Sequence, residues 1–293
     1  MLNLCDPRTI RQVMDMFGLT FKKEYGQNFL TDNMTVEDIA DACNVDKDIT
    51  VVEIGPGIGC MTRELCERYS RVIAFEIDEG LIPVLKYTLD GYNNVTVINE
   101  DVMKADLDSI LAPYFEMGKV AVCANLPYYI TTPILMKLIE SKLPFDSITV
   151  MVQTEVAERL AAGAGKKNCG AITAAIDYYG DAKMLFTVTA DRFMPPPKVN
   201  SSVVRIDLWK DKPVKPIDEE LFFRTIKAAF EQRRKTLPNS LQTGFSEIPK
   251  DKLTEIIVSC GHRPDVRGEK LSVKDFCALS DAIYHEINGQ SKT

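Results

Sequence analysis

The chain has 293 residues, of which 45% are hydrophobic and 26% charged, and its formal net charge is −7. This composition is typical of a soluble globular protein and excludes disordered, collagen-like and coiled-coil chains. No stretch reaches the roughly 18 uninterrupted apolar residues of a membrane helix, and the N-terminal segment mixes charged with apolar residues, unlike a signal peptide. We therefore expect a cytoplasmic protein that does not contact a membrane.

Segments with helix and strand patterns alternate from about residue 33. The apolar residues Val36, Ile39, Ala40 and Cys43 have helical spacing. Strands are predicted at 50–54, 71–77, 95–98, 120–124 and 147–152, and helices begin near residues 61, 81 and 153. A further helix over 132–140 is predicted to have Thr132 as its N-cap. This alternation predicts an α/β fold, a Rossmann-like parallel sheet covered on both faces.

The end of the chain has a different pattern. After a helix over 171–179, two β-rich runs at 184–189 and 201–208 could form an antiparallel pair. A segment with Lys, Asp and two prolines, residues 209–216, is typical of a linker, and every periodic segment beyond it is helical. We therefore predict a Rossmann-like domain over 1–210 and a small all-helical domain over 216–293.

Histidine and cysteine patterns limit the chemistry. Both histidines, His262 and His285, lie near the C-terminus, which effectively excludes a Ser-His-Asp or Cys-His hydrolase on the first 261 residues. The eight cysteines form no Cys-x-x-Cys pair, so neither a metal site nor a disulfide framework is indicated. The chemistry must then use carboxylates, amides, aromatic rings or a cofactor.

A glycine-rich segment, residues 53–59 (EIGPGIG), joins the first strand to the next helix. Glycines such as Gly55 and Gly57 allow a sharp turn and close approach to a ligand. Glu76 ends the second strand, where its carboxylate can accept hydrogen bonds from ribose hydroxyls. Asp101 ends the third and could accept one from an adenine amino group. The G-x-G-x-G spacing favours S-adenosylmethionine as the cofactor and leaves NAD as the alternative.

The fourth strand ends in the motif Asn125-Leu126-Pro127-Tyr128. The asparagine oxygen and a backbone carbonyl next to the proline can both accept hydrogen bonds from an exocyclic NH2 group. The nitrogen lone pair would then point at a methyl donor, and the tyrosine ring offers a stacking face for a base. We therefore predict transfer of a methyl group to a base nitrogen, without a histidine base.

These motifs together resemble the ribosomal RNA adenine N6,N6-dimethyltransferases, the KsgA group, which is related to the Erm resistance methylases. The likeness covers nearly the whole chain. It includes the glycine segment and the motifs at residues 23–30, 75–78, 125–130, 153–159, 193–199 and 230–237.

The resemblance implies roles for individual residues. Asn28 and Leu30 would contact the cofactor, Gly55 would pass under its methionine part, and Ile77 would pack on its adenine. Asn125 would contact both the cofactor and the target amine. Tyr128 and Phe193 would sandwich the target base.

The resemblance also implies an RNA substrate, namely two adjacent adenosines in the 3′-terminal hairpin loop of 16S rRNA in the small ribosomal subunit. Residues 1–210 carry a net charge of −8 and residues 211–293 a net charge of +1. RNA contact must therefore depend on local basic patches, for which we predict Lys22, Lys23, Arg233, Arg234 and Lys235. An Erm-type enzyme acting on large-subunit rRNA, a non-catalytic ribosome assembly factor and a DNA amino-methyltransferase are the alternatives. We expect a monomer without a metal ion.

Overall fold

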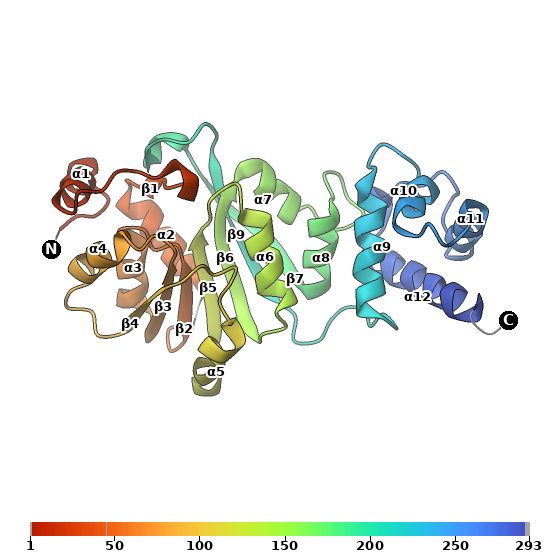
Figure 1. The fold of residues 1–293 in the computed structure, drawn as a ribbon, viewed down its shortest axis with the longest axis horizontal. Helices are drawn as coiled ribbons and strands as arrows, with labels where there is room; N and C mark the ends of the chain where they lie inside the picture. Colours follow the sequence, from red (N-terminus) through yellow and green to blue (C-terminus); the bar gives the residue numbers. More distant parts are fainter. Residues whose placement is uncertain (1, 45, 291–293) are drawn as a thin grey trace. The chain divides into compact units, whose positions relative to one another are not determined.

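The computed structural model describes residues 2–44 and 46–290 (Figure 1). Contacts divide the chain into two compact units. The first contains the residues up to Ala157 together with Lys183–Leu208, and the second contains Glu158–Ala182 together with the residues from Trp209 onward. Residues 158–182 therefore group with the C-terminal helices. The domain bounds 1–210 and 216–293 stay a prediction.

A seven-stranded sheet forms the first unit, in the order β4-β3-β2-β5-β6-β9-β7 (Figure 1). Neighbouring strands from β4 to β6 are parallel, as predicted, and β9 is antiparallel to β6. The two late β-rich runs lie next to each other as β9 and β7. The central strand β2 is buried along its whole length, as expected for a parallel strand with both faces covered. The strands are β2 (Thr50–Ile54), β3 (Arg71–Glu76), β4 (Val95–Asn99), β5 (Val120–Asn125), β6 (Phe145–Gln153), β7 (Gly180–Val188) and β9 (Ser201–Leu208).

The carboxyl ends of four parallel strands meet at one edge of this sheet. Ile54, the last residue of β2, is level with Phe75 on β3 and with Ala124 on β5. Glu76, the last residue of β3, is level with Asn99 on β4. The segments that follow these strands therefore start side by side, which is where open α/β sheets bind their ligands.

Helices precede and connect the strands of this unit. Helix α2 has the predicted stripe, with Val36, Ile39, Ala40 and Cys43 all buried. The helices are α1 (Pro7–Met16), α2 (Asn33–Cys43), α3 (Cys60–Arg68), α4 (Leu81–Thr88), α5 (Leu107–Met117) and α6 (Thr131–Glu140). A short helix η1 (Lys23–Tyr25) follows α1, and η2 (Ala190–Arg192) precedes β8. A two-stranded sheet pairs β1 (Phe29–Leu30) with β8 (Phe193–Met194).

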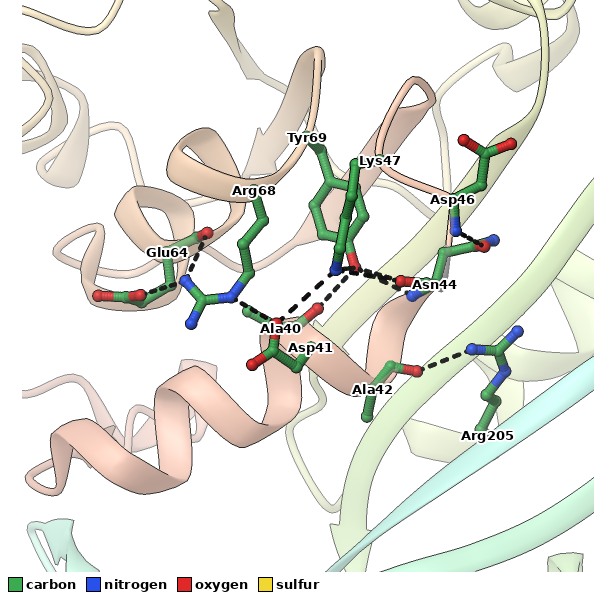
Figure 2. Close-up of polar contacts among 10 residues, drawn as sticks. All are labelled: Ala40, Asp41, Ala42, Asn44, Asp46, Lys47, Glu64, Arg68, Tyr69 and Arg205. Carbon is green, nitrogen blue, oxygen red and sulfur yellow. Dashed lines mark hydrogen bonds and ion pairs between the residues drawn. The ribbon is translucent and has the colours of Figure 1, made fainter.

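Polar side chains satisfy the carbonyl groups at the end of α2 (Figure 2). The buried Tyr69 hydroxyl lies 2.7 Å from the Ala40 carbonyl and accepts a hydrogen bond from the Asn44 amide at 3.0 Å. Arg205 on β9 donates to the Ala42 carbonyl at 3.0 Å. Because the last carbonyls of a helix have no partner within the helix, these contacts tie α2 to α3 and to the sheet.

The second unit is helical. It contains α8 (Ala171–Tyr179), α9 (Glu219–Glu231), α10 (Leu237–Gly244), α11 (Lys250–Ser259), the short η3 (Gly268–Lys270) and α12 (Val273–Gln290), while α7 (Thr154–Leu160) crosses from the first unit. Ser272 and Asp275 form a capping box at the start of α12, because they exchange side-chain and backbone hydrogen bonds. In the described part of the chain, no helix is both long and apolar enough to span a bilayer.

Some predicted details were wrong or missing. Helix α6 begins at Thr131, and no side chain caps it; the Thr131 hydroxyl instead donates to the Pro127 carbonyl at 3.1 Å. Thr132 is therefore inside the helix rather than its N-cap. Helices α1, α5 and α10 were not predicted. Helix α5 contains an internal proline, Pro113, and a proline in a sequence ordinarily indicates the end of a helix.

Candidate cofactor and active site

A cavity lies at the carboxyl ends of the strands in the first unit. Its walls come from the segment before α2, from the glycine segment, from the ends of β2 and β3, and from the motif after β5. Segments far apart in sequence thus meet around one cavity, as expected for motifs that follow the ends of neighbouring strands. The lining residues are Tyr25–Leu30, Glu53, Gly55–Gly57, Cys60, Met61, Glu76, Ile77, Leu81 and Asn125–Tyr128.

The glycine segment passes close to the opposite wall of this cavity. Gly55 and Gly57 have φ angles of 73° and 62°, a region that favours glycine. A Cβ atom on Gly57 would lie 2.9 Å from Cε1 of Phe29, so a larger residue does not fit without displacing that ring. The backbone here can therefore approach a ligand more closely than any side-chain-bearing segment could.

Glu76 is a buried carboxylate beside the glycine segment, with 5% of the residue exposed. Its Oε2 accepts a hydrogen bond from the Gly57 amide at 3.1 Å, and its Oε1 accepts one from the Asp78 amide at 2.8 Å. Burial raises the pKa of Glu76 to about 7, against the lowering effect of these amides. The remaining lone pairs can accept from hydroxyl groups of a ligand in the cavity.

Glu53 is a cavity residue that the sequence analysis did not assign. It is completely buried, and neither carboxylate oxygen has a hydrogen-bond partner among the described residues. Burial raises its pKa to about 8, against the lowering effect of the nearby Thr62 hydroxyl, which is also buried and has no hydrogen-bond partner among the described residues. A buried carboxyl group without a partner is costly, so a cationic or hydrogen-bond-donating ligand in the cavity would compensate for it. The sequence feature that could have identified Glu53 is its position, two residues before Gly55 and near the end of a buried strand.

A second chamber continues from the first and shares Tyr25, Gly55, Ile77 and Pro127 with it. Asp101 lines this second chamber, together with the exposed ring of Tyr129 and residues 100–103. Ile77 is 45% exposed, although it is apolar and next to a buried strand. An apolar wall can pack against the face of a planar ring, and a nearby carboxylate can accept a hydrogen bond from the ring's polar edge.

The motif at the end of β5 contributes Asn125, Leu126, Pro127 and Tyr128 to the wall of the first cavity. Asn125 donates from Nδ2 to the backbone carbonyl of Asn28 at 3.2 Å, which turns its Oδ1 toward other partners. Leu126 is buried. The Pro127 carbonyl already accepts from the Ile130 amide at 3.1 Å as well as from the Thr131 hydroxyl. Tyr128 is half-buried, and its hydroxyl lies 2.7 Å from the Ser201 hydroxyl.

Phe193 does not line this cavity in the structure. It is 4% exposed and pairs with Leu30 across the β1–β8 ladder, within the hydrophobic core that also contains Met151 and Val203. Its ring is therefore a core residue in this arrangement. A sandwich of the target base between Tyr128 and Phe193 stays a prediction that requires the ring of Phe193 to become accessible.

The predicted RNA contacts lie in different surroundings. Lys22 forms an ion pair with Asp78 at 2.7 Å, and this partner raises the pKa of the lysine. The side chain of Lys23 lies outside the described residues. In the second unit, Arg233, Arg234 and Lys235 are all exposed, and Arg233 donates to the Cys169 carbonyl at 3.1 Å. Within the described residues, no group of three or more His, Cys, Asp or Glu side chains could hold a metal ion.

Comparison with known sequences extends over nearly the whole chain. The pattern of the family described as ribosomal RNA adenine dimethylase matches residues 18–284. A protein named ribosomal RNA small subunit methyltransferase A from Streptococcus thermophilus (strain CNRZ 1066) is 46% identical over 285 residues, which cover 96% of this chain and 98% of the relative. A protein of the same name from Bacillus mycoides (strain KBAB4) is 45% identical over 293 residues, which cover 98% and 100%.

Two solved structures share the fold. A dimethyladenosine transferase from Plasmodium falciparum superposes with a TM-score of 0.71 at 24% identity, covering 89% of this chain and 98% of that chain. The 23S rRNA methyltransferase ErmE gives a TM-score of 0.66 at 22% identity, covering 87% and 99%. The predicted fold class, a methyltransferase sheet followed by helices, is confirmed. On the match to its sequence pattern and to full-length relatives, the chain belongs to the ribosomal RNA adenine dimethylase family.

Proposed function

We propose that this protein is an enzyme that uses S-adenosyl-L-methionine to dimethylate N6 of two adjacent adenosines in the 3′-terminal hairpin loop of 16S rRNA. The substrate is the small ribosomal subunit or its precursor in the cytoplasm, so the reaction contributes to ribosome biogenesis. The family and the full-length relatives named as small-subunit methyltransferases support this reaction class. The observation that carries the proposal is the cavity that brings Glu53, Glu76 and Asn125 together.

The cavity fits the proposed cofactor. Glu53 is a buried carboxyl group without a partner, which suits the ammonium group of a methionine moiety. Gly57 leaves no room for a side chain where the ligand would pass, and Glu76 has lone pairs for the ribose hydroxyls. Ile77 and Asp101 would hold the adenine by its face and its amino group. When bound, S-adenosylmethionine supplies a methyl group on an electrophilic sulfonium.

The protein's part in the transfer is to orient the target amine. The hydrogen bond from Asn125 to the Asn28 carbonyl leaves Oδ1 of Asn125 to accept from the adenine amino group. The carbonyl of Leu126 would accept the second amine proton, since the neighbouring Pro127 carbonyl already has two donors. With both protons engaged, the nitrogen lone pair points toward the methyl group, and such positioning is a large part of catalysis. Tyr128 would stack on the base.

After the first transfer the nitrogen releases one proton to solvent, so an adenosine with one N6-methyl group has its lone pair and one proton, which engages one of the two acceptors. It can therefore re-enter the same site and receive the second methyl group. Loop adenosines suit the site because they are partly unstacked, which lowers the cost of drawing one into a cavity. Exposed cations on the second unit, Arg234 and Lys235, would contact phosphates.

Methyl transfer to purified ribosomal particles tests the proposal. Small-subunit particles that lack the modification should accept labelled methyl groups, and digestion should release N6,N6-dimethyladenosine. Large-subunit RNA should not be labelled, and Asn125→Ala should not label either substrate. Labelling of the large-subunit RNA alone would identify an Erm-type enzyme, and no labelling with normal particle binding would identify a non-catalytic assembly factor.

A further inference from the structure

One wall of the cofactor cavity is a segment that precedes the sheet, residues 22–30, here called the N-terminal strap. Six of its residues, Tyr25–Leu30, line the cavity. Gly26 packs so closely on the motif after β5 that a Cβ atom would lie 3.0 Å from Cβ of Pro127. The Asn28 carbonyl is the group that accepts from Asn125. The position of the strap therefore decides both the shape of the cavity and the orientation of the Asn125 amide.

The strap is held at one end by a single buried carboxylate. The side chain of Asp78 is 4% exposed. Its Oδ1 accepts from Lys22 Nζ at 2.7 Å and from the Gly80 amide at 3.0 Å, and its Oδ2 accepts from Gln27 Nε2 at 2.9 Å. Gln27 completes the arrangement by accepting the Lys22 amide at its Oε1, at 2.8 Å. Both strap side chains are thus hydrogen-bonded to a residue more than fifty positions away.

Asp78 is also joined to the cofactor wall itself. Its backbone amide donates to Oε1 of Glu76 at 2.8 Å. The same carboxylate of Glu76 holds the Gly57 amide through its other oxygen. A continuous set of hydrogen bonds therefore runs from the strap through Asp78 and Glu76 to the glycine segment. Asp78 itself is not among the residues that line the cavity, although its partners Gln27 and Glu76 are.

We propose that Asp78 is a positioning residue that fixes the N-terminal strap over the cofactor cavity, through Lys22 and Gln27. The carboxylate is required because it must accept from three donors on two oxygens, which a neutral amide cannot do. With the strap fixed, the Asn28 carbonyl holds the Asn125 amide in the orientation that transfer needs. The effect on catalysis and on cofactor affinity rests on the proposed function, whereas the anchoring of the strap does not.

A reciprocal exchange of carboxylate and amide tests this arrangement. In Asp78→Asn, the new Nδ2 faces Gln27 Nε2, so two donors meet. In Gln27→Glu, two carboxylates meet. In the double variant, the amide oxygen at position 78 can still accept from Lys22 and Gly80, and the amide nitrogen there can donate to one carboxylate oxygen at position 27. The other carboxylate oxygen at position 27 can accept the Lys22 amide. The double variant therefore keeps the net charge and every hydrogen bond, with one of them reversed, while Lys22 donates to a neutral amide instead of forming an ion pair with residue 78.

Hydrogen exchange of the strap amides in ligand-free protein is the first measurement. In each single variant, the amide hydrogens of residues 22–30 should exchange at least about tenfold faster than in wild type. In the double variant, their exchange rates should lie within about threefold of the wild-type rates. Glu79→Gln, which changes an exposed carboxylate one residue away, is the matched control and should exchange like wild type. Equal exchange in all variants, or a double variant as fast as the singles, would overturn the anchor.

Calorimetry and kinetics then test the consequence. Each single variant should bind S-adenosylmethionine about tenfold more weakly and lower kcat by a similar factor, and the double variant should recover both. Recovery in the double variant ties the loss to the contact between residues 27 and 78, since destabilisation from an unrelated cause would not be repaired by the second substitution. If the strap exchanges as expected but wild type binds no S-adenosylmethionine, the proposed function fails and the anchor stands. Single variants with a loosened strap and unchanged affinity and kcat would overturn the positioning role.

Discussion

Replacing Glu76 by glutamine should remove the part of the pH dependence of cofactor binding that Glu76 contributes around neutrality. Burial raises the pKa of Glu76 to about 7 in the ligand-free protein. Ribose hydroxyls that donate to this group favour its ionised form, so wild-type affinity should rise with pH. A carboxyl group with this pKa is ionised in roughly one molecule in eleven at pH 6 and ten in eleven at pH 8, which gives about a tenfold gain in affinity.

The size of the loss in Glu76→Gln follows from the hydrogen bonds. Those to a charged acceptor contribute about 1.5–3 kcal/mol, so at pH 8 the variant should bind roughly ten- to 150-fold more weakly than wild type. At pH 6 the gap should shrink by about tenfold, because wild-type Glu76 is then mostly neutral. Glutamine also has only one acceptor oxygen for the Gly57 and Asp78 amides, so a small loss of thermal stability should accompany the change.

Isothermal titration calorimetry with S-adenosylmethionine between pH 6 and pH 8 measures both profiles. The difference between wild type and Glu76→Gln isolates this residue, since Glu53, with a pKa raised to about 8, is common to both proteins. Glu79→Gln, an exposed carboxylate in the same loop, is the control and should follow wild type. Parallel pH profiles for wild type and Glu76→Gln would refute the assignment of the ribose contact.

Three further predictions concern other parts of the site. Asn125→Ala should lower kcat for particle methylation by at least about a hundredfold in single-turnover assays, because it removes the acceptor that orients the amine. Its affinity for the cofactor should change by less than about tenfold. An unchanged rate would exclude that geometry. Arg234→Ala with Lys235→Ala should weaken particle binding and flatten its dependence on the logarithm of salt concentration by roughly 0.7–0.9 for each lost phosphate contact; filter binding at several salt concentrations checks this, and an unchanged slope would mean that these side chains only face solvent. Burial raises the pKa of Glu53 from 4.5 to about 8, so the unfolded chain releases this proton at a lower pH than the native protein does. The stability of the native protein therefore falls progressively between about pH 4.5 and pH 8. Glu53→Gln cannot ionise, and its ligand-free Tm should exceed that of wild type by a few degrees at pH 8 and match it at pH 5; the opposite order at pH 8 in differential scanning calorimetry would contradict the burial argument.

Much of the fold and half of the site follow from local sequence patterns. Alternating strand and helix patterns determined the parallel sheet, because each pattern reflects burial of a nearby face. Glu76, Asp101 and Asn125 could be placed because each follows a predicted parallel strand, and such strand ends meet at one edge. The glycines of the loop were informative for the same local reason, since their positive φ angles are needed within the turn itself.

Contacts between distant residues decided the rest. Glu53 lies in a fully buried strand and Phe193 in a two-residue strand, and the sequence does not tell which of these side chains reaches a cavity and which enters the core. Lys22, whose contact with RNA stays a prediction, forms an ion pair with Asp78, a partner 56 positions away. Forming this ion pair loses little conformational entropy once the fold has brought the two segments together. Neither segment alone indicates the pairing. The tertiary structure therefore determines which polar groups bind a ligand and which hold the cavity in shape.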